Sequence, residues 1–547
     1  MTLSLQTRAF GLGATGTWLA LALFALLTFL PAFARLPITD RDEARFAQSS
    51  RQMVESGDLI DIRFQDEPRY KKPVGIYWLQ AASVAAVGEE GALWVYRLPS
   101  LFGAVLAVLL VGVTGAPLFG RPAALFAAAV FAGGLVIGGE ARIAKTDAVN
   151  LALILAAQAV LARLYLGHAV GRIGVYAFWL AIALGILVKG PIGPMVPALT
   201  ALALFLVDRR GDWLKTLWVP QPIMVALIIV LPWFVAITLR SHGAFWWGSV
   251  GADLLPKVVA GQEGKGAPPG SYLLALWITL WPATPLLLLA LPAIWRARHQ
   301  APTRFCLAWV LPVWLVYEAI PTKLVHYTLP AYPALVLLAV GHLSQGLALA
   351  GRGLKLAATL ASVAGLLPTL LLAGYAVRVE DWQALPFIGV GIAASLAAGG
   401  LALRSLVQKS PLRLAGFAAL AGTFLNAGLF AALPRIPALW PTEAAVAQAN
   451  RIATTQGCER PQLIGWGYGE PSLVWHGGKD TRLFPASAPE AQVLLPSDCA
   501  VVVHLRQNGL ALPSLGNACR LVSTASGFAI GAGRQVTLDI LDCHTAP

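Results

Sequence analysis

The feature that most constrains this chain is a series of long apolar runs separated by short polar loops. Of its 547 residues, 57% are hydrophobic and only 12% are charged. An apolar run of about 18 residues or more is long enough to cross a bilayer as a helix. The chain is therefore predicted to be an all-α polytopic membrane protein with about thirteen transmembrane helices. The predicted spans are 11–33, 94–115, 121–139, 149–167, 174–189, 191–207, 218–239, 271–293, 303–320, 326–346, 355–377, 384–403 and 412–433.

Charges in the loops predict how these helices are oriented. Cytoplasmic loops are enriched in Lys and Arg, and alternate loops of this chain show that excess, with almost no acid beyond Asp208 and Asp212. The chain is therefore expected to start inside and to end its last span outside. The first run is longer than a signal-peptide core, which favours a retained helix over a cleaved leader. Gly75 to Val87 is too short to cross and is predicted to be interfacial or re-entrant. The basic residues of the six inside loops are Arg121; Arg163 and Arg172; Arg209, Arg210 and Lys215; Arg296, Arg298 and Arg304; Arg352 and Lys355; and Arg404, Lys409 and Arg413.

The charge pattern also narrows the class of function. The net charge of +13 lies largely in these loops, and the chain has neither a basic tail nor an aromatic-basic platform for stacking bases. We therefore expect no nucleic-acid partner. Transporters usually carry buried polar groups or broken, repeated helices at the membrane midplane. Most spans here have no charged residue near the middle, which counts against transport.

The first polar loop, 35–72, concentrates charge in a chain that otherwise has little. It holds eight acidic and eight basic residues. Phe46, Met53 and Leu59 recur at roughly helical spacing, which predicts a short amphipathic helix along the membrane surface. We define 35–92 as the predicted catalytic loop. Three further polar loops, 140–147, 240–270 and 321–327, are predicted on the same outer side, so the four loops are expected to form one shared site.

The pattern changes from Ile436 onward, where short β-rich runs alternate with Gly and Pro clusters. We predict a transmembrane domain over 1–435 and a soluble α/β domain over 436–547, outside the cytoplasm. The β-rich runs are 462–466, 472–476, 500–505 and 535–541. Four of the five cysteines lie in this region, where an oxidising compartment would favour disulfides. Of the three possible connectivities, we favour Cys458–Cys499 with Cys519–Cys543.

Asp42 and Glu43 are the first candidates for chemistry. Acids at a helix start complement the helix dipole and are often only solvated. The functional alternative is a general base that takes a proton from an acceptor. Arg45, three residues after Asp42, shares its helix face and could hold a phosphate or pair with the acid.

The sequence Arg69-Tyr70-Lys71-Lys72 is the second candidate. Lys and Arg beside embedded segments often only contact lipid headgroups. The alternative is a cation pocket that stabilises the charge on a departing lipid phosphate. In the later loops, Asp147 could cap a helix, fix Lys72 or Arg142, or bind sugar hydroxyls. Lys323, His326 and Tyr327 are either membrane anchors or part of the site.

Other catalytic motifs are missing from the sequence. It contains no P-loop, no nucleophile elbow and no close His/Cys metal spacing. A Rossmann-type site for a nucleotide sugar also has no visible place. If the protein transfers a sugar, its donor is therefore not expected to be a cytosolic nucleotide sugar.

Several segments together resemble the bacterial membrane glycosyltransferases of the GT-C class, the group of lipid A aminoarabinose transferases and protein O-mannosyltransferase relatives. They span nearly the whole chain in the order and spacing of that class. The matching segments are Asp42 to Ala47, Lys72-Pro73 with Tyr77-Trp78, Arg142 to Ala148, Lys323 to Tyr327 with Pro330 and Pro333, and Gly469 to Leu473.

The resemblance implies inverting transfer of a sugar from a polyprenyl-phosphate carrier on the outer face of the inner membrane. By this resemblance Asp42 is the candidate base and Asp147 the second essential acid. Predicted substrate-binding residues are Glu43, Arg45, Tyr70, Lys71, Lys72, Arg142, Lys323, His326 and Tyr327.

One departure concerns a metal. The aminoarabinose transferases have a Glu before the conserved Lys and a His in a later outer loop, which together can hold a metal. Here those positions are Lys71 and Gly251-Ala252-Asp253, so that metal site is not expected. No cofactor is assigned, and a divalent metal stays open as an alternative. The extra lysine suits an anionic donor or acceptor.

The sequence therefore predicts an inner-membrane glycosyltransferase, acting as a monomer among membrane lipids, with lipid A, lipopolysaccharide or another envelope glycan as acceptor. A protein acceptor is the second choice. Two alternatives of other classes are a polyprenyl-lipid transporter without chemistry and a scaffold that binds partners through its C-terminal domain.

Overall fold

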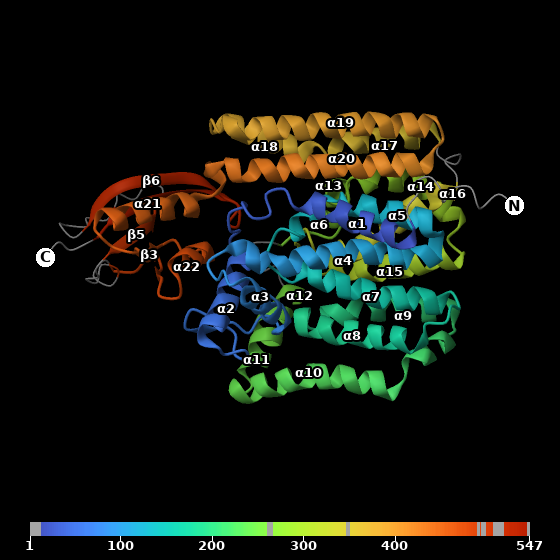
Figure 1. Cartoon of the computed structure of the whole chain (residues 1–547), viewed down its shortest axis with the longest axis horizontal. Helices are drawn as coiled ribbons and strands as arrows, with labels where there is room; N and C mark the ends of the chain where they lie inside the picture. The colour runs from blue at the N-terminus through green and yellow to red at the C-terminus, as the bar shows by residue number, and fades with distance from the viewer. Residues whose placement is uncertain are drawn as a thin grey trace.

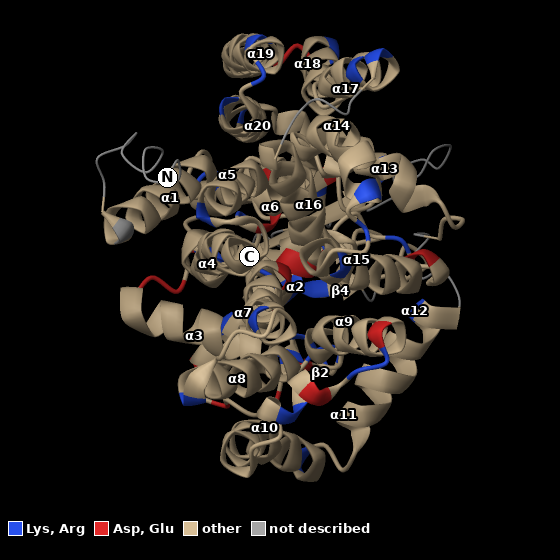
Figure 2. Ribbon diagram, turned by 90° about the vertical axis from the view of Figure 1, so that its right-hand side faces the viewer, with Lys and Arg blue, Asp and Glu red and all other residues tan. Residues whose placement is uncertain are grey.

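The computed structural model describes residues 13–259, 266–345, 351–489, 493, 499–506 and 519–543. Within these residues, seven helices are long and apolar enough to cross a membrane, and a bent helix pair, 271–279 with 283–296, makes an eighth if it is one span. Five shorter apolar helices coincide with further predicted segments. Figure 2 shows the same character, because charged residues colour only short parts of a mostly tan ribbon. The multi-pass helical prediction is confirmed, and the count of thirteen stays a prediction.

Helices account for most of the described chain. The α-helices are α1 (Ala14–Phe29), α2 (Asp42–Ser56), α3 (Gly75–Val87), α4 (Leu93–Phe119), α5 (Arg121–Ala132), α6 (Leu135–Glu140), α7 (Asp147–Tyr165), α8 (Gly171–Lys189), α9 (Ile192–Asp208), α10 (Pro220–Arg240), α11 (Ala244–Trp246), α12 (Leu255–Val259), α13 (Ser271–Thr279), α14 (Ala283–Arg296), α15 (Ala301–Ala319), α16 (Tyr332–Gln345), α17 (Arg352–Ala364), α18 (Leu367–Arg378), α19 (Leu385–Val407), α20 (Pro411–Ala432), α21 (Pro441–Thr455) and α22 (Pro471–Gly477). The other helical turns are η1 (Asp212–Leu217), the π-helix η2 (Trp247–Leu254), η3 (Leu329–Ala331), η4 (Trp382–Ala384), η5 (Leu433–Arg435) and η6 (Pro437–Leu439).

The long helices run side by side, with α19 along one edge of the bundle and α10 along the other (Figure 1). Glycines allow some of them to approach closely. A Cβ on Gly103 of α4 would lie 2.9 Å from Cα of Val149 in α7, so the two backbones meet where no side chain intervenes. Small residues at such contacts permit the van der Waals packing that holds membrane helices together. The α4–α7 contact thereby fixes the start of α7, where the candidate site lies.

Two predicted features of the outer loops can be compared with the structure. The amphipathic helix predicted from Phe46, Met53 and Leu59 is α2, in which Phe46 and Met53 are buried, but Leu59 lies beyond its end and is exposed. The segment 240–270 is partly helical rather than an open loop, since it contains α11, η2 and α12, and its residues 260–265 lie outside the described residues. Figure 1 places α2, α3 and α11 at the end of the bundle from which the C-terminal sheet extends.

The C-terminal region holds a five-stranded mixed sheet of order β4-β3-β5-β7-β6. Strand β3 is parallel to β4 and β5, whereas β7 is antiparallel to β5 and β6. The predicted strands at 462–466, 500–505 and 535–541 are confirmed, but 472–476 is wrong because it forms α22. Pro471 lies in the first turn of that helix, where its fixed φ suits the start. The strands are β3 (Gln462–Trp466), β4 (Arg482–Phe484), β5 (Ala500–Leu505), β6 (Arg520–Ala529) and β7 (Arg534–Asp542), with a separate hairpin of β1 (Arg63–Phe64) and β2 (Glu67–Pro68).

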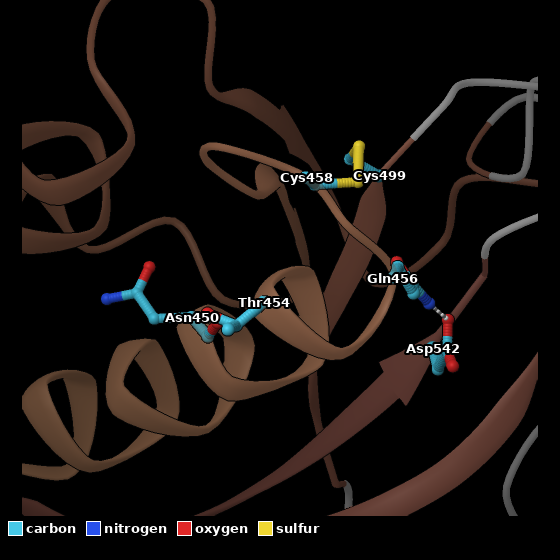
Figure 3. Close-up of a disulfide and its surroundings, with 6 residues drawn as sticks. All are labelled: Asn450, Thr454, Gln456, Cys458, Cys499 and Asp542. Atoms are coloured by element: carbon cyan, nitrogen blue, oxygen red, sulfur yellow. Dashed lines mark hydrogen bonds between the residues drawn. A yellow bond between two sulfur atoms is a disulfide. The ribbon is translucent and has the colours of Figure 1, made fainter.

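Two disulfides tie this region together, with the predicted connectivity. Cys458–Cys499 joins the turn after α21 to the start of β5, and Cys519–Cys543 joins the ends of the β6–β7 pair. Near the first disulfide, the side chain of Gln456 donates a hydrogen bond to Asp542 (Figure 3). The boundary at 435/436 stays a prediction.

Candidate functional site

The candidate site begins at the first turn of α2. Arg41 has a φ of 70°, which is uncommon for a residue with a side chain. Asp42 follows as the first residue of the helix. The carboxylate of Asp40 accepts a hydrogen bond of 3.1 Å from the backbone N–H of Ser472 in α22. The helix start is thus attached to the C-terminal region.

Asp42 lies among cations from other segments. Its side chain is exposed although protein atoms crowd around it. Burial alone would raise the pKa of Asp42, but the positive charges of Lys145 and Arg69 lower the pKa below its ordinary value. The group is therefore a carboxylate at neutral pH, which is the state a proton acceptor needs.

A second carboxylate, Asp147, is the meeting point of three cationic or titratable side chains. Its Oδ1 lies 2.5 Å from Nζ of Lys189 at the end of α8 and 3.7 Å from Nε2 of His326. Its Oδ2 lies 3.7 Å from Nζ of Lys145. The negative charge of Asp147 also acts on Asp42. The structure therefore brings together three predicted residues, Asp42, Asp147 and His326, from three of the outer loops.

Lys145 connects the members of this cluster. Its Nζ lies 2.8 Å from Oε1 of Glu140 and 3.3 Å from Nδ1 of His326. Burial disfavours the charged ammonium, but Glu140, Asp147 and Asp42 together raise the pKa of Lys145 above its ordinary value. Burial also raises the pKa of Glu140 to about 7, even with Lys145 beside it. Lys145 is therefore the fixed positive charge of the cluster, and Glu140 is the member that titrates near neutral pH.

His326 is neutral in this setting. Burial lowers its pKa to about 3, and the nearby positive charge of Lys145 adds to that effect. Since the ammonium of Lys145 can only donate, Nδ1 of His326 must accept the hydrogen bond. The imidazole proton is therefore on Nε2, the nitrogen that faces Asp147.

Lys72 forms a second group of charges beside the first. Its Nζ lies 2.7 Å from Oδ2 of Asp253 in η2, and Nζ of Lys257 in α12 lies 2.7 Å from Oδ1 of the same carboxylate. Burial lowers the pKa of Lys72, an effect that Asp253 opposes and Lys189 reinforces. The action of Lys189 on both Lys72 and Asp147 shows that the two groups of charges adjoin.

Glu43 does not have the environment predicted for a substrate-binding residue. It is fully buried. Arg97 in α4 lies 2.8 Å from Oε1, and the backbone N–H of Ala144 donates to the same oxygen. The other oxygen accepts from Thr39. These contacts favour a structural role for Glu43, because both of its oxygens are inaccessible and already accept hydrogen bonds; its substrate contact stays a prediction.

Arg142 and Lys323 also make contacts that favour a structural role. Arg142 is fully buried, donates to backbone carbonyls of residues 28, 31 and 138, and lies 4.1 Å from the ring centre of Phe430. Lys323 donates to three carbonyls at the end of α15, those of residues 317, 318 and 320. Such carbonyls lack helical partners and favour a cation. The predicted substrate contacts of both residues stay predictions.

The remaining predicted residues lie at the periphery of the cluster. Tyr70 donates a 2.7 Å hydrogen bond to Asp61, and burial together with that bond raises its pKa to about 12. Tyr327 packs against His326, with ring centres 5.2 Å apart. Arg45 is half-buried and its charge acts on Glu470. Lys71 is exposed. Substrate contacts of these four residues stay predictions.

Sequence reasoning missed three lysines that line the two groups of charges. Lys145 lies inside the predicted outer loop 140–147, Lys189 at the end of a predicted span, and Lys257 in the segment 240–270. The position of Lys189 carried a usable signal, since a charged residue at the end of an apolar run, directly before Gly190-Pro191, is costly in a membrane unless it is paired.

Among the described residues, no group of three or more His, Cys, Asp or Glu side chains is placed to hold a metal ion. Asp253, in the region where the resembled class has a metal-binding His, instead lies between two lysines. Two ammonium groups beside this carboxylate do not fit a divalent cation.

Known proteins with similar sequences are described as glycosyltransferases that use lipid-phosphate-linked sugars. Residues 71–235 match the family described as dolichyl-phosphate-mannose-protein mannosyltransferase. The curated undecaprenyl phosphate-alpha-4-amino-4-deoxy-L-arabinose arabinosyl transferase of Pseudomonas paraeruginosa is 31% identical over 62% of this chain and 62% of its own length. The enzyme of the same name from Aeromonas hydrophila is 29% identical over 76% of this chain and 77% of its length. The chain thus spans about three fifths of the first of these relatives.

Solved structures extend the likeness to the whole fold. ArnT from Cupriavidus metallidurans bound to undecaprenyl phosphate has a TM-score of 0.75 at 20% identity, covering 96% of this chain and 98% of that one. The oligosaccharyltransferase of Archaeoglobus fulgidus has a TM-score of 0.50 at 12% identity, covering 88% of this chain and 66% of that one. The chain resembles the lipid A aminoarabinose transferases of the GT-C class and has their fold.

Proposed function

We propose that this protein is an inner-membrane glycosyltransferase that moves a sugar from a polyprenyl-phosphate donor to an envelope acceptor, with inversion. The observation that carries the proposal is the meeting of Asp42 and Asp147 with Lys72, Lys145 and Lys189 at one end of an apolar helix bundle. Sugar transfer from a lipid phosphate requires a base and cations that stabilise the phosphate leaving group, and this site supplies both. The reaction requires no nucleotide.

In the proposed reaction, Asp42 accepts the proton of an acceptor hydroxyl as its oxygen bonds to the anomeric carbon of the donor sugar. The bond between that carbon and the phosphate oxygen breaks, and polyprenyl phosphate leaves with the electron pair. Lys72 stabilises the negative charge that develops on the phosphate. Asp147 holds Lys145, Lys189 and the Nε2 proton of His326 in fixed positions around the reacting groups.

Several observations support a periplasmic location for the site. The loop charges predict that the site-bearing loops and the C-terminal region face outward. Two disulfides in that region agree with an oxidising compartment. The relatives named as arabinosyl transferases use a carrier whose phosphate matches the cations here. We extend the same orientation and a lipid-linked donor to this chain.

Lipid A or lipopolysaccharide is the favoured acceptor because the chain resembles the lipid A aminoarabinose transferases, and relatives named as arabinosyl transferases align over 62% and 76% of it. A protein acceptor is the second candidate, favoured by the name of the family that matches residues 71–235. Lipid analysis of a deletion strain separates the two, since a lipid acceptor predicts the loss of one sugar mass from lipid A or lipopolysaccharide.

A direct assay tests the activity. Purified protein in detergent is incubated with lipid-linked sugar and crude lipopolysaccharide, and free polyprenyl phosphate is measured. Release that requires the acceptor supports transfer. Movement of the lipid across liposomes without any release would instead indicate a transporter and would contradict the proposal.

A further inference from the structure

The two lysines of the second group of charges already hold an anion that belongs to the chain itself. The ammonium groups of Lys72 and Lys257 each lie 2.7 Å from a different oxygen of Asp253. The Asp253 side chain is 4% exposed, whereas those of Lys72 and Lys257 are 22% and 26% exposed. The carboxylate is therefore sequestered, while both cations remain reachable from outside.

This arrangement imitates the way a phosphate would be held. A carboxylate that bridges two cations presents two negative oxygens, as a phosphate monoester does. If Lys72 stabilises the donor phosphate, that phosphate must compete with Asp253 for the same ammonium groups. A carboxylate that simply stayed in place would repel the incoming anion, because like charges at such distances are unfavourable.

The backbone that carries Asp253 is suited to a change of position. Residues Trp247–Leu254 form the π-helix η2, a rare conformation that often occurs at functional sites. This segment lies directly against the predicted phosphate pocket, since a Cβ on Gly248 would be 2.9 Å from Cβ of Tyr70. A shift of η2 would therefore move the turn at Tyr70 and change the position of Lys72.

We propose that Asp253 occupies the phosphate position in the ligand-free protein and gives up Lys72 and Lys257 when polyprenyl phosphate binds. This inference rests on the proposed function and adds a residue that sets affinity for the leaving group. Two uncompensated lysines would retain the product phosphate, whereas a competing carboxylate favours its release after each transfer. Asp253 is thus an affinity-determining residue rather than a proton carrier.

The test compares full-length wild-type protein with Asp253→Asn, using undecaprenyl phosphate as the probe and undecaprenol as the uncharged control. Calorimetric titration in detergent should show undecaprenyl phosphate binding about tenfold more tightly to the variant, a difference of about 1.4 kcal/mol. Undecaprenol should bind both proteins equally. The matched control is Asp212→Asn, which removes the acid of an exposed Asp–Lys pair and should leave both affinities unchanged.

Equal or weaker binding of undecaprenyl phosphate by Asp253→Asn would overturn the inference. A second measurement needs no variant, since hydrogen exchange of the amides of residues 247–254 in the wild type should rise when undecaprenyl phosphate is added. Unchanged or slower exchange would contradict displacement. If the wild type does not distinguish undecaprenyl phosphate from undecaprenol, the proposed function itself fails, and that result is distinct from the other two.

Discussion

Asp42 and Glu43 are adjacent carboxylates in the first turn of α2, yet the fold gives them opposite environments. Glu43 is fully buried and paired with Arg97, which is also fully buried. Asp42 is exposed and lies in the field of Lys145 and Arg69. Consecutive helical residues point about 100° apart, so one face of α2 meets α4 and another meets the charged loops.

The contrast shows that charge alone does not mark a functional residue in this protein. Glu43, Arg142 and Lys323 have hydrogen-bonding capacity that is filled by backbone groups or a buried partner. Asp42 and Lys72 remain reachable. We therefore expect the first set to determine stability and the second to determine turnover.

The largest expected effect is on turnover, at Asp42. Asp42→Asn keeps the shape of the side chain but removes the proton acceptor, so transfer should fall by about 10²–10⁴-fold, the usual contribution of a general base. The melting temperature should be unchanged. Release of polyprenyl phosphate and a thermal melt in detergent measure the two quantities.

A control for this variant is Asp58→Asn. Asp58 lies on the same loop as Asp42 and forms a partly exposed ion pair with Arg240 at the end of α10. The control variant should retain nearly full turnover. Substantial activity in Asp42→Asn would exclude Asp42 as the base. The expected difference in role between Asp42 and Glu43 would then be wrong.

Arg97→Met should produce the opposite pattern. The substitution leaves Glu43 buried without its cation, which typically costs about 3–5 kcal/mol of stability. The melting temperature should fall strongly, while turnover per folded molecule should stay near that of the wild type. The double variant Glu43→Leu with Arg97→Met should recover much of the loss, because it leaves no uncompensated charge. A stable Arg97→Met single variant would contradict the structural role.

Much of the fold could be predicted because its signals are local. Apolar run length predicts the helical bundle, the spacing of Phe46 and Met53 predicts α2, and alternation predicts β3, β5 and β7. The run 472–476 was assigned wrongly because a short apolar segment fits a strand or a buried helix, and Pro471 decides between them only in context.

The site could be predicted in part, for a related reason. Sequence placed Asp42, Asp147 and Lys72 among the candidates, since polar loops on one side of a membrane tend to meet. It could not separate Asp42 from Glu43, or Arg142 from Lys145. That difference depends on which residues of α1 and α4 come within hydrogen-bonding distance, such as the carbonyl of Thr28 for Arg142 and the guanidinium of Arg97 for Glu43.

Lys72→Ala tests the second of the two reachable side chains, Asp42 and Lys72, and its expected effect on turnover is smaller than that of Asp42→Asn. Loss of a charged hydrogen-bonding partner costs about 1.5–3 kcal/mol, so kcat/KM for the lipid-linked donor should fall roughly ten- to hundredfold. The exposed Lys215→Ala should leave donor kinetics unchanged. Unaltered kcat/KM for the donor in Lys72→Ala would exclude its phosphate role.

The last expected effect is on stability rather than on turnover and concerns Glu140, which is buried yet titrates near neutral pH. Burial raises its pKa to about 7 from an ordinary value of 4.5, so the folded state holds this proton more tightly than the unfolded chain does. As pH rises from 4.5 to 7, stability should therefore fall by at most about 1.4 kcal/mol per pH unit, then level off above pH 7. Glu140→Gln removes that dependence, so its melting temperature relative to the wild type should increase from pH 5 to pH 8. A difference that stays constant over this range would show that Glu140 does not change its ionisation between pH 5 and pH 8 and would contradict the raised pKa.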